Sequence, residues 1–243
     1  MPEHRKCVAI IGAGRVGSWI ALNIAQIEIR RLVLIDDDRI SEDNIKVPGM
    51  VPYTFFELDS YKCDTLARKV IAINKKAHVR AFRTKISPQM GKDALERIFG
   101  DSLLIIFAID TVAGLKVLEM PEIMSKRLSI IPAMHHDGGG HIVCWIPSFT
   151  PCPAHTLGLE SFDEIRESKA SEAGISPADA RIVSGIASEL AVSLLFNRFG
   201  SNWKPFDIRK GNYLHIEKLK DGRYQKILIN PHKRYGCRLC NLR

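Results

Sequence analysis

The chain has 243 residues, of which 46% are hydrophobic and 26% are charged, and its formal net charge is +8. This is the composition of a globular protein, and the longest apolar run, residues 103–109, is far shorter than the about 20 residues of a membrane-spanning helix. We recognise no signal peptide and expect a cytoplasmic protein without a membrane partner. Positive charge favours acidic partners, but the basic clusters lack the interleaved aromatic residues of a nucleic-acid platform, which argues against nucleic acid.

The first elements form a βαβ unit around a glycine-rich turn. Apolar runs predict strands over 8–11 and 32–35, and helical spacing predicts a helix over about 15–28. The turn Gly12-Ala13-Gly14-Arg15-Val16-Gly17 opens this helix, and Asp36 follows the second strand. Glycines let a backbone approach phosphates at a helix N-terminus, and an acid at this spacing suits ribose hydroxyls, so the pattern predicts nucleotide binding.

Further α/β units follow along the chain. Residues 39–59 are irregular and form a candidate lid or substrate-contact segment. We then expect a helix over 60–74, a strand over 78–82, a helix from Ser87-Pro88, a buried strand over 102–109, a helix near 112–127, and strands over 128–133 and 142–146. The order predicts a Rossmann-like, doubly wound α/β fold over residues 1–150, with a mostly parallel sheet and helices on both faces.

Residues 151–243 are expected to pack on this core as a lobe of the same domain. A polar segment with weak helical character, 158–174, precedes a helix over about 177–199. A hairpin with strands over 213–219 and 224–229 then turns around Asp221-Gly222.

Two pairs of metal-ligating residue types lie in turn-rich parts of this lobe. Cys152 and His155 are three positions apart, as are Cys237 and Cys240. Two such pairs suit a closed, tetrahedral zinc site, whereas a Cys-x-x-Cys pair alone also suits redox chemistry. The alternative is reduced thiols beside a surface histidine. We predict structural zinc that staples the C-terminal tail.

A second group of residues carries a resemblance to a known family. Asp38 and Asn44 follow Asp36, Lys62 lies in the next predicted helix, and Asp110 follows the buried strand. In this order they resemble the ThiF/MoeB/HesA family of adenylating enzymes, relatives of the ubiquitin-activating enzymes, over nearly the whole chain. The resemblance implies an ATP-dependent adenylyltransferase that activates a carboxylate as an acyl-adenylate and releases pyrophosphate. It also implies a homodimer.

The resemblance implies roles for individual residues. Asp36 would hold the ribose, Asp38 and Asn44 would line the phosphate side, and Lys62 would contact phosphates. Asp110 would position magnesium. The full nucleotide-binding set is Gly12, Gly14, Arg15, Gly17, Asp36, Asp38, Asn44, Lys46, Lys62, Asp110 and Thr111, with Thr111 in place of an asparagine common in the family. Asp110, Lys62 and Arg15 are the expected catalytic residues. The resemblance also supports zinc binding, with His155 in place of one cysteine.

One departure from the family pattern concerns charge. Val47 stands where the family usually carries an arginine. Cations must balance the charge on the departing pyrophosphate, so we expect Arg15 or Lys46 to bind the nucleotide in its place, with Arg15 in a catalytic role. Arg5 of a partner subunit is the other candidate.

The predicted activity ends at the adenylate. No cysteine lies between Cys152 and Cys237, so we expect no internal thioester and a separate acceptor enzyme. The resemblance implies that the substrate is the C-terminus of a ubiquitin-like or sulfur-carrier protein, or a small biosynthetic acid. In the loop 135–141, His135 and His136 are candidates for substrate contact, the alternatives being a metal site or a plain glycine-rich loop.

Two other functions remain open on the sequence. The first is a nucleotide-binding scaffold of the same family that has lost catalysis, which the missing arginine favours. The second, ranked last, is an NAD-dependent oxidoreductase, which explains the glycine turn and Asp36 but neither the zinc-like pairs nor Lys62 and Asp110.

Overall fold

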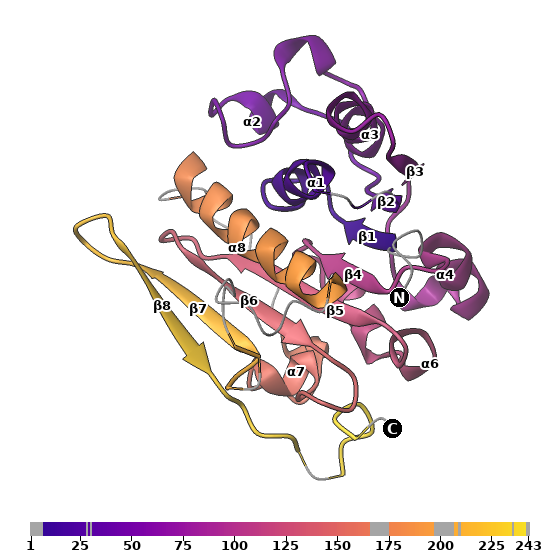
Figure 1. The fold of residues 1–243 in the computed structure, drawn as a ribbon, viewed down its shortest axis with the longest axis vertical. Helices are drawn as coiled ribbons and strands as arrows, with labels where there is room; N and C mark the ends of the chain where they lie inside the picture. Colours follow the sequence, from indigo (N-terminus) through magenta and orange to yellow (C-terminus); the bar gives the residue numbers. More distant parts are fainter. Residues whose placement is uncertain are drawn as a thin grey trace.

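One eight-stranded sheet organises the residues that the computed structural model describes, which are 7–27, 29, 31–165, 175–196, 207–208, 210–234 and 236–241. Its strand order is β3-β2-β1-β4-β5-β6-β7-β8 (Figure 1). The strands are β1 (Cys7–Ile11), β2 (Arg31–Ile35), β3 (His78–Phe82), β4 (Leu104–Phe107), β5 (Leu128–Met134), β6 (Gly140–Trp145), β7 (Tyr213–Lys218) and β8 (Tyr224–Ile229).

The sheet has a parallel part and an antiparallel part. Strands β3, β2, β1, β4 and β5 pair in parallel, whereas β6, β7 and β8 continue the same sheet in antiparallel fashion. Every residue of β1 and β4 is buried, as expected of central strands that are covered on both faces. The predicted mostly parallel α/β fold is confirmed, and the predicted C-terminal hairpin extends its sheet.

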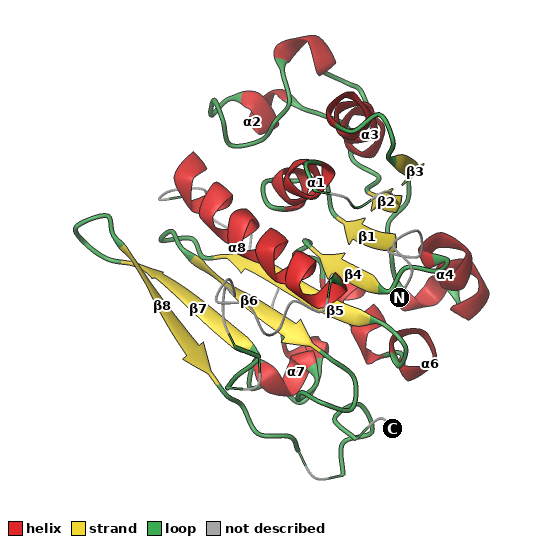
Figure 2. Cartoon of the chain, viewed as in Figure 1, coloured by secondary structure: helices red, strands yellow, loops and turns green. Residues whose placement is uncertain are grey.

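Helices cover both faces of the sheet (Figure 2). One face packs against α1 (Gly17–Ala25), α3 (Lys62–Ile73) and α8 (Pro177–Leu195). The other packs against α4 (Lys92–Phe99), α5 (Val112–Leu115), α6 (Pro121–Met124) and α7 (Pro153–Thr156). Alternate strand residues serve the two cores, so Val8 and Ile10 face the first group while Cys7, Ala9 and Ile11 face the second.

Three predicted segments differ from the structure. The helix expected over 112–127 is broken into α5, a 3-10 turn over Lys116–Glu119 and α6, because Pro121 lacks the amide that a continuous helix would need. The helix expected from Ser87 begins only at Lys92, after Gly91 takes a φ of +75°. The segment 39–59 is not wholly irregular, since it contains α2 (Glu42–Ile45) and a 3-10 turn over Phe55–Glu57.

Parts of other predicted elements lie outside the described residues. These are positions 166–174 of the polar segment, positions 197–199 of the helix expected over 177–199, position 28 of the first helix, and Arg5. No described helix has the length and apolarity that crossing a membrane would require.

Asp179, in the first turn of α8, connects that helix to the antiparallel part of the sheet. Its buried carboxylate accepts hydrogen bonds from the Gly139 amide at 3.2 Å, the Tyr224 hydroxyl at 2.5 Å and the Lys218 ammonium at 3.1 Å. Ser176 donates both its amide and its hydroxyl, each at 2.6 Å. Burial alone would raise the pKa of Asp179, but these donors outweigh it and lower the pKa.

We expect Asp179→Asn to lower the free energy of unfolding at pH 7 by about 2–3 kcal/mol, because it places an amide against groups that donate to a carboxylate. An aspartate with a lowered pKa stabilises the fold above the pKa of the unfolded chain and loses this contribution as the pH falls through the folded value. Denaturant unfolding should therefore show a difference between variant and wild type that narrows below about pH 4.

The matched control is Glu217→Gln, which removes an exposed carboxylate from β7 of the same hairpin. It should leave stability within about 0.5 kcal/mol of wild type. Equal effects of the two variants would contradict the connecting role of Asp179.

Candidate functional site

The glycine-rich turn between β1 and α1 is held by close backbone packing. Gly12 has a φ of +92°, and a Cβ there would lie 2.2 Å from the Ala108 oxygen that follows β4. A Cβ on Gly17 would lie 1.9 Å from the Gly12 oxygen. A Cβ on Gly14, by contrast, would meet nothing within 4 Å. Two glycines thus permit the tight turn, and the third leaves open space at the start of α1, where helix amides favour an anion.

Asp36 fixes the turn to the end of β2. One carboxylate oxygen accepts the Ala13 amide at 2.6 Å, and the other accepts the Asp38 amide at 2.8 Å. Burial raises the pKa of this carboxyl, although both amides act in the opposite direction. Tyr53, from the segment after α2, donates its hydroxyl to the Ala13 oxygen at 2.7 Å and is itself buried.

Tyr53 was missed by the sequence analysis. Its place in the unusually long segment after the second strand was the signal that could have drawn attention to it. Burial raises the pKa of Tyr53 well above its usual value, and the nearby Asp36 adds to this, so the phenol stays protonated and can donate. The segment therefore braces the nucleotide turn from the side.

Lys62 and Asp38 meet as an ion pair beside this turn. The Lys62 ammonium, on the first residue of α3, lies 2.8 Å from an Asp38 carboxylate oxygen. The Lys62 side chain is only 9% exposed, against 61% for Asp38. The carboxylates of Asp36, Asp37 and Asp38 also approach within 4.8 Å of one another. The structure thus brings together one buried cation and a group of acids that the sequence singled out.

The phosphate-side residues Asn44 and Lys46 belong to α2 and its end. The Asn44 side-chain oxygen accepts the Ser41 amide at 3.1 Å, which caps the helix. Lys46 lies 3.8 Å from Asp43 in an exposed ion pair, which contributes little to stability. Val47 is 38% exposed.

Asp110 and Thr111 follow β4, at the same edge of the sheet as Asp36. Asp110 is exposed, and Thr111 is the N-cap of α5. Asp110 does not join the close group of acids at 36–38 within the described residues, so a single ion held by all of them is not preformed. Arg15, within the glycine turn, is not free, because it already interacts with another group of the protein.

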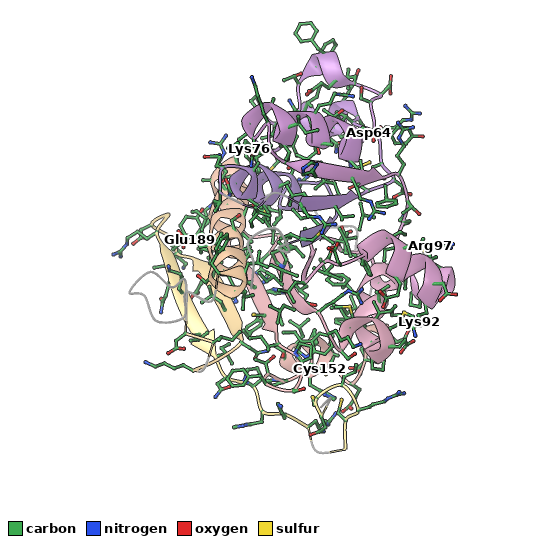
Figure 3. The ribbon with its side chains drawn as sticks, turned by 45° about the vertical axis from the view of Figure 1, so that its right-hand side comes forward. Asp64, Lys76, Lys92, Arg97, Cys152 and Glu189 are labelled. Atoms are coloured by element: carbon green, nitrogen blue, oxygen red, sulfur yellow. The ribbon has the colours of Figure 1, made fainter. Side chains whose placement is uncertain are left out.

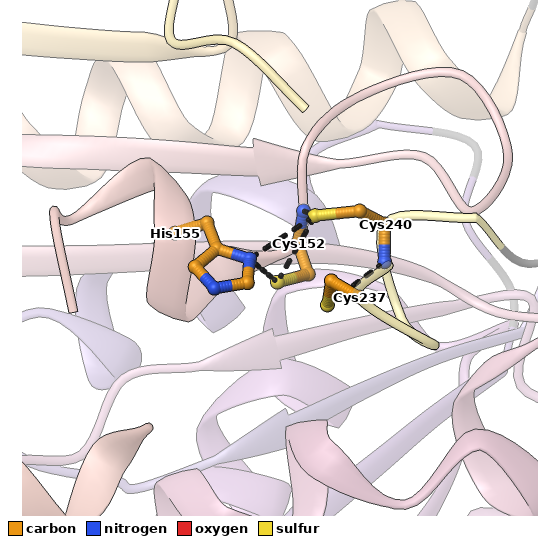
Figure 4. A group of neighbouring side chains, drawn as sticks. All are labelled: Cys152, His155, Cys237 and Cys240. Atoms are coloured by element: carbon orange, nitrogen blue, oxygen red, sulfur yellow. Dashed lines mark hydrogen bonds between the residues drawn. The ribbon is translucent and has the colours of Figure 1, made fainter. Parts of the chain in front are cut away.

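The predicted metal ligands lie together, brought in by the segment after β6 and by the C-terminal tail after β8 (Figure 4). His155 Nδ1 lies 3.3 Å from Cys152 Sγ and 3.2 Å from Cys240 Sγ, and these two sulfurs are 3.5 Å apart. Cys237 completes a set whose ligand atoms lie within 4.8 Å of one another. The donor atoms around a tetrahedral zinc ion are about 3.3–3.8 Å apart, so the three cysteine sulfurs and the His155 imidazole fit the ion.

Local structure explains how these ligands are positioned. Cys152 caps α7, which carries His155, while the Cys240 amide points at Cys237 Sγ at 3.4 Å. Burial opposes ionisation of Cys240, but hydrogen bonds from the Cys152 amide and from His155 stabilise its thiolate and lower its pKa to about 7. Cys152 lies far from Asp64 of α3 in Figure 3. The four protein ligands leave no open position, which suits a structural ion.

A cluster of histidines forms on the sheet face opposite α8. His135 Nε2 and His141 Nδ1 are 2.9 Å apart, and the His135 and His215 rings are 5.2 Å apart. Burial lowers the pKa of His141 to about 4 and also lowers the pKa of His135, so both rings are neutral near pH 7. His136 is exposed. The sequence analysis missed His215, which β7 places opposite His141.

Comparisons with known proteins give one family. The model of the ThiF family matches residues 4–239. The tRNA threonylcarbamoyladenosine dehydratase of Haemophilus influenzae (strain ATCC 51907 / DSM 11121 / KW20 / Rd) is 32% identical over 105 residues, which are 43% of this chain and 38% of that protein. The chain therefore matches less than half the length of this curated relative.

Solved structures share the fold. MccB of E. coli with MccA-N7isoASN has a TM-score of 0.74 at 13% identity, over 98% of this chain and 69% of that chain. MccB with ATP has a TM-score of 0.72 at 14% identity, over 98% and 68%. PaaA has a TM-score of 0.66 at 23% identity, over 93% and 66%. At such identities the likeness shows the fold alone.

We expect one zinc ion per chain in protein purified without chelators, measured by elemental analysis. Removal of the ion by a chelator should lower the melting temperature by about 5 °C or more, because the ion links two distant segments. Cys237→Ser and His155→Ala should lose zinc, whereas His155→Cys should retain it. His232→Ala, an exposed histidine of the same tail, is the control. A zinc-free protein whose stability Cys237→Ser leaves unchanged would contradict the site.

Proposed function

The chain belongs to the ThiF family, and from this premise we propose that it is an ATP-dependent adenylyltransferase that activates a carboxylate. The proposal rests on the arrangement of side chains at the edge of the sheet where β1, β2 and β4 have their carboxyl ends. There Gly14 leaves open space at a helix N-terminus, Asp36 closes the turn, and the buried Lys62 is paired with Asp38. An NAD-dependent oxidoreductase would need no buried lysine at this place.

The proposal gives each residue at this edge a physical task. The glycine turn and the first amides of α1 hold phosphate oxygens, and Asp36 accepts from the ribose hydroxyls. Lys62 and Asn44 direct donors at the phosphates, with Arg15 and Lys46 adding charge, and Asp110 with Thr111 binds magnesium. Bound magnesium would polarise phosphoryl oxygens and neutralise charge as pyrophosphate departs. MccB, with the same fold, has been solved with ATP.

The carboxylate substrate is the finer part of the proposal. We favour the C-terminus of a ubiquitin-like or sulfur-carrier protein, with a small biosynthetic acid as the alternative. His135 and His136 follow β5 at the carboxyl edge, from which they can contact such a tail. No cysteine lies between Cys152 and Cys237, so the adenylate passes to a separate acceptor enzyme without an internal thioester.

The same proposal assigns the two parts of the chain. Residues 1–150 bind and activate, and residues 151–243 complete the sheet and staple the tail through a structural zinc ion held by Cys152, His155, Cys237 and Cys240. We further propose a homodimer, in which Arg5 of one protomer can approach the phosphates bound by its partner.

The test is ATP/pyrophosphate exchange with a panel of carboxylates: ubiquitin-like proteins ending in Gly-Gly, small acids, and tRNA that carries threonylcarbamoyladenosine, the modified nucleoside in the name of a curated relative, whose threonyl group has a carboxylate. We expect exchange with one protein or small-acid class. Exchange with tRNA alone would identify tRNA, rather than a protein tail or a small acid, as the substrate. ATP binding with no exchange on any carboxylate would favour the scaffold that has lost catalysis, and binding of NADH but not ATP would overturn both readings.

We expect Lys62→Met to weaken ATP binding by about tenfold or more while the chain stays folded, because methionine keeps the buried packing but removes the charge-assisted hydrogen bonds. Calorimetric titration with ATP and thermal melting measure the two effects. Lys69→Met on the same helix removes a lysine paired with Glu57 and serves as control. Equal ATP affinities of the two variants would remove Lys62 from the site.

A further inference from the structure

We propose that Arg181 of α8 binds the β- and γ-phosphates of the nucleotide, an inference that rests on the proposed ATP site. No pattern in the sequence singles out Arg181. It lies 165 positions after Val16 in the sequence, yet packing brings α8 against the helix that begins at the glycine turn (Figure 1).

The packing contact between α8 and α1 places Arg181 near the glycine-rich turn. Ser184 donates its hydroxyl to the Val16 oxygen at 3.0 Å, and Val16 is the residue from which α1 begins. Ser188, one turn later, accepts from Asn23 at 3.2 Å. Arg181 lies three residues before Ser184, so it is on the same face of α8 and about 4.5 Å further along the axis. This step places it beside the first turn of α1, where Trp19 lies.

Two groups hold the guanidinium in place. Its carbon lies 4.7 Å from the centre of the Trp19 ring on α1, a cation–π contact. The Trp19 ring is fixed in turn, because its Nε1 donates to the Met50 oxygen at 3.0 Å. On the other side, a Cβ at Gly49 would lie 3.2 Å from Arg181 Nη2. The guanidinium therefore lies between α1 and the segment that follows α2. Its neighbour in that segment, Gly49, is two residues after Val47.

The basic side chains around this position differ in whether an acidic side chain pairs with them. Lys62 is paired with Asp38, and Lys46 lies 3.8 Å from Asp43. Arg15 has an interaction of its own. Across the part of the chain that the structure describes, Arg181 makes no ion pair with a carboxylate. Its positive charge, on a side chain already oriented by an aromatic ring, is thus available to an anionic ligand.

The chemistry of the ligand follows from charge and position. A triphosphate bound at the glycine turn carries several negative charges, and its terminal phosphates extend beyond the amides of α1. The guanidinium fork matches phosphate oxygens in pairs, and stacking on Trp19 reduces the rotamer entropy that binding would otherwise cost. Arg181 should therefore recognise the terminal phosphates, which ATP has and AMP lacks.

The test is calorimetric titration of the full chain with ATP and with AMP, both with magnesium and without a carboxylate substrate. We expect Arg181→Ala to weaken ATP binding about tenfold and AMP binding less than twofold, since a hydrogen bond to a charged group is lost only with ATP. Arg181→Lys should recover part of the ATP affinity, because lysine keeps the charge without the fork. Trp19→Phe, which keeps a smaller ring, should fall between Arg181→Ala and wild type.

Arg97→Ala is the matched control, because it removes the same charge from α4, on the opposite face of the sheet (Figure 3). If Arg181→Ala binds ATP as Arg97→Ala does, or weakens ATP and AMP equally, the assignment of Arg181 is overturned while the proposed function stands. If the wild-type chain binds no ATP, the proposed function fails and the assignment fails with it. A melting temperature within about 2 °C of wild type shows that each variant is folded.

Discussion

The close backbone approach between the glycine turn and the end of β4 is the constraint on which the rest of the site depends. Gly12 and Gly17 have no room for a Cβ, so β1, α1 and β4 converge at one point of the sheet edge. Asp36 then ties β2 to the same turn through the Ala13 amide, and Tyr53 ties in the segment after α2. These four elements and the segment after α2 therefore meet around the open space beside Gly14, and a side chain at either packed glycine would separate β1, α1 and β4.

Structural anchors lie at both ends of the sheet, whereas the glycine turn lies at only one of them. The buried carboxylate of Asp179 joins α8 to the hairpin and to the turn at Gly139, which keeps the antiparallel strands in register with the parallel core. At the other end, the cysteines and His155 connect the tail to α7. Because the anchor lies away from the nucleotide turn, the tail can be fixed without occupying the site.

The positions of the basic side chains distinguish this member of the ThiF family from the pattern that its resemblance to the family implied. Val47 leaves the segment after α2 without a cation at a position where the family resemblance led us to expect arginine. Arg181 reaches the neighbouring Gly49 from another helix and is oriented by Trp19. A charge supplied from α8 depends on how α8 packs against α1, so the contact at Ser184 connects the position of Arg181 to the Asp179 network five residues earlier in the same helix.

The sequence by itself determined the βαβ order, the glycine turn, the acid after β2 and the two pairs of metal-ligating residues. These are local patterns, because strand and helix periodicity, turn chemistry and ligand spacing act over a few residues. Even the break at Pro121 has a local cause, which the predicted helix over 112–127 overlooked. Only the tertiary structure brought Tyr53 to Ala13, His215 to His141 and Arg181 to Trp19. These contacts join residues 40 to 162 positions apart, and their partners are set by which helix covers which strand.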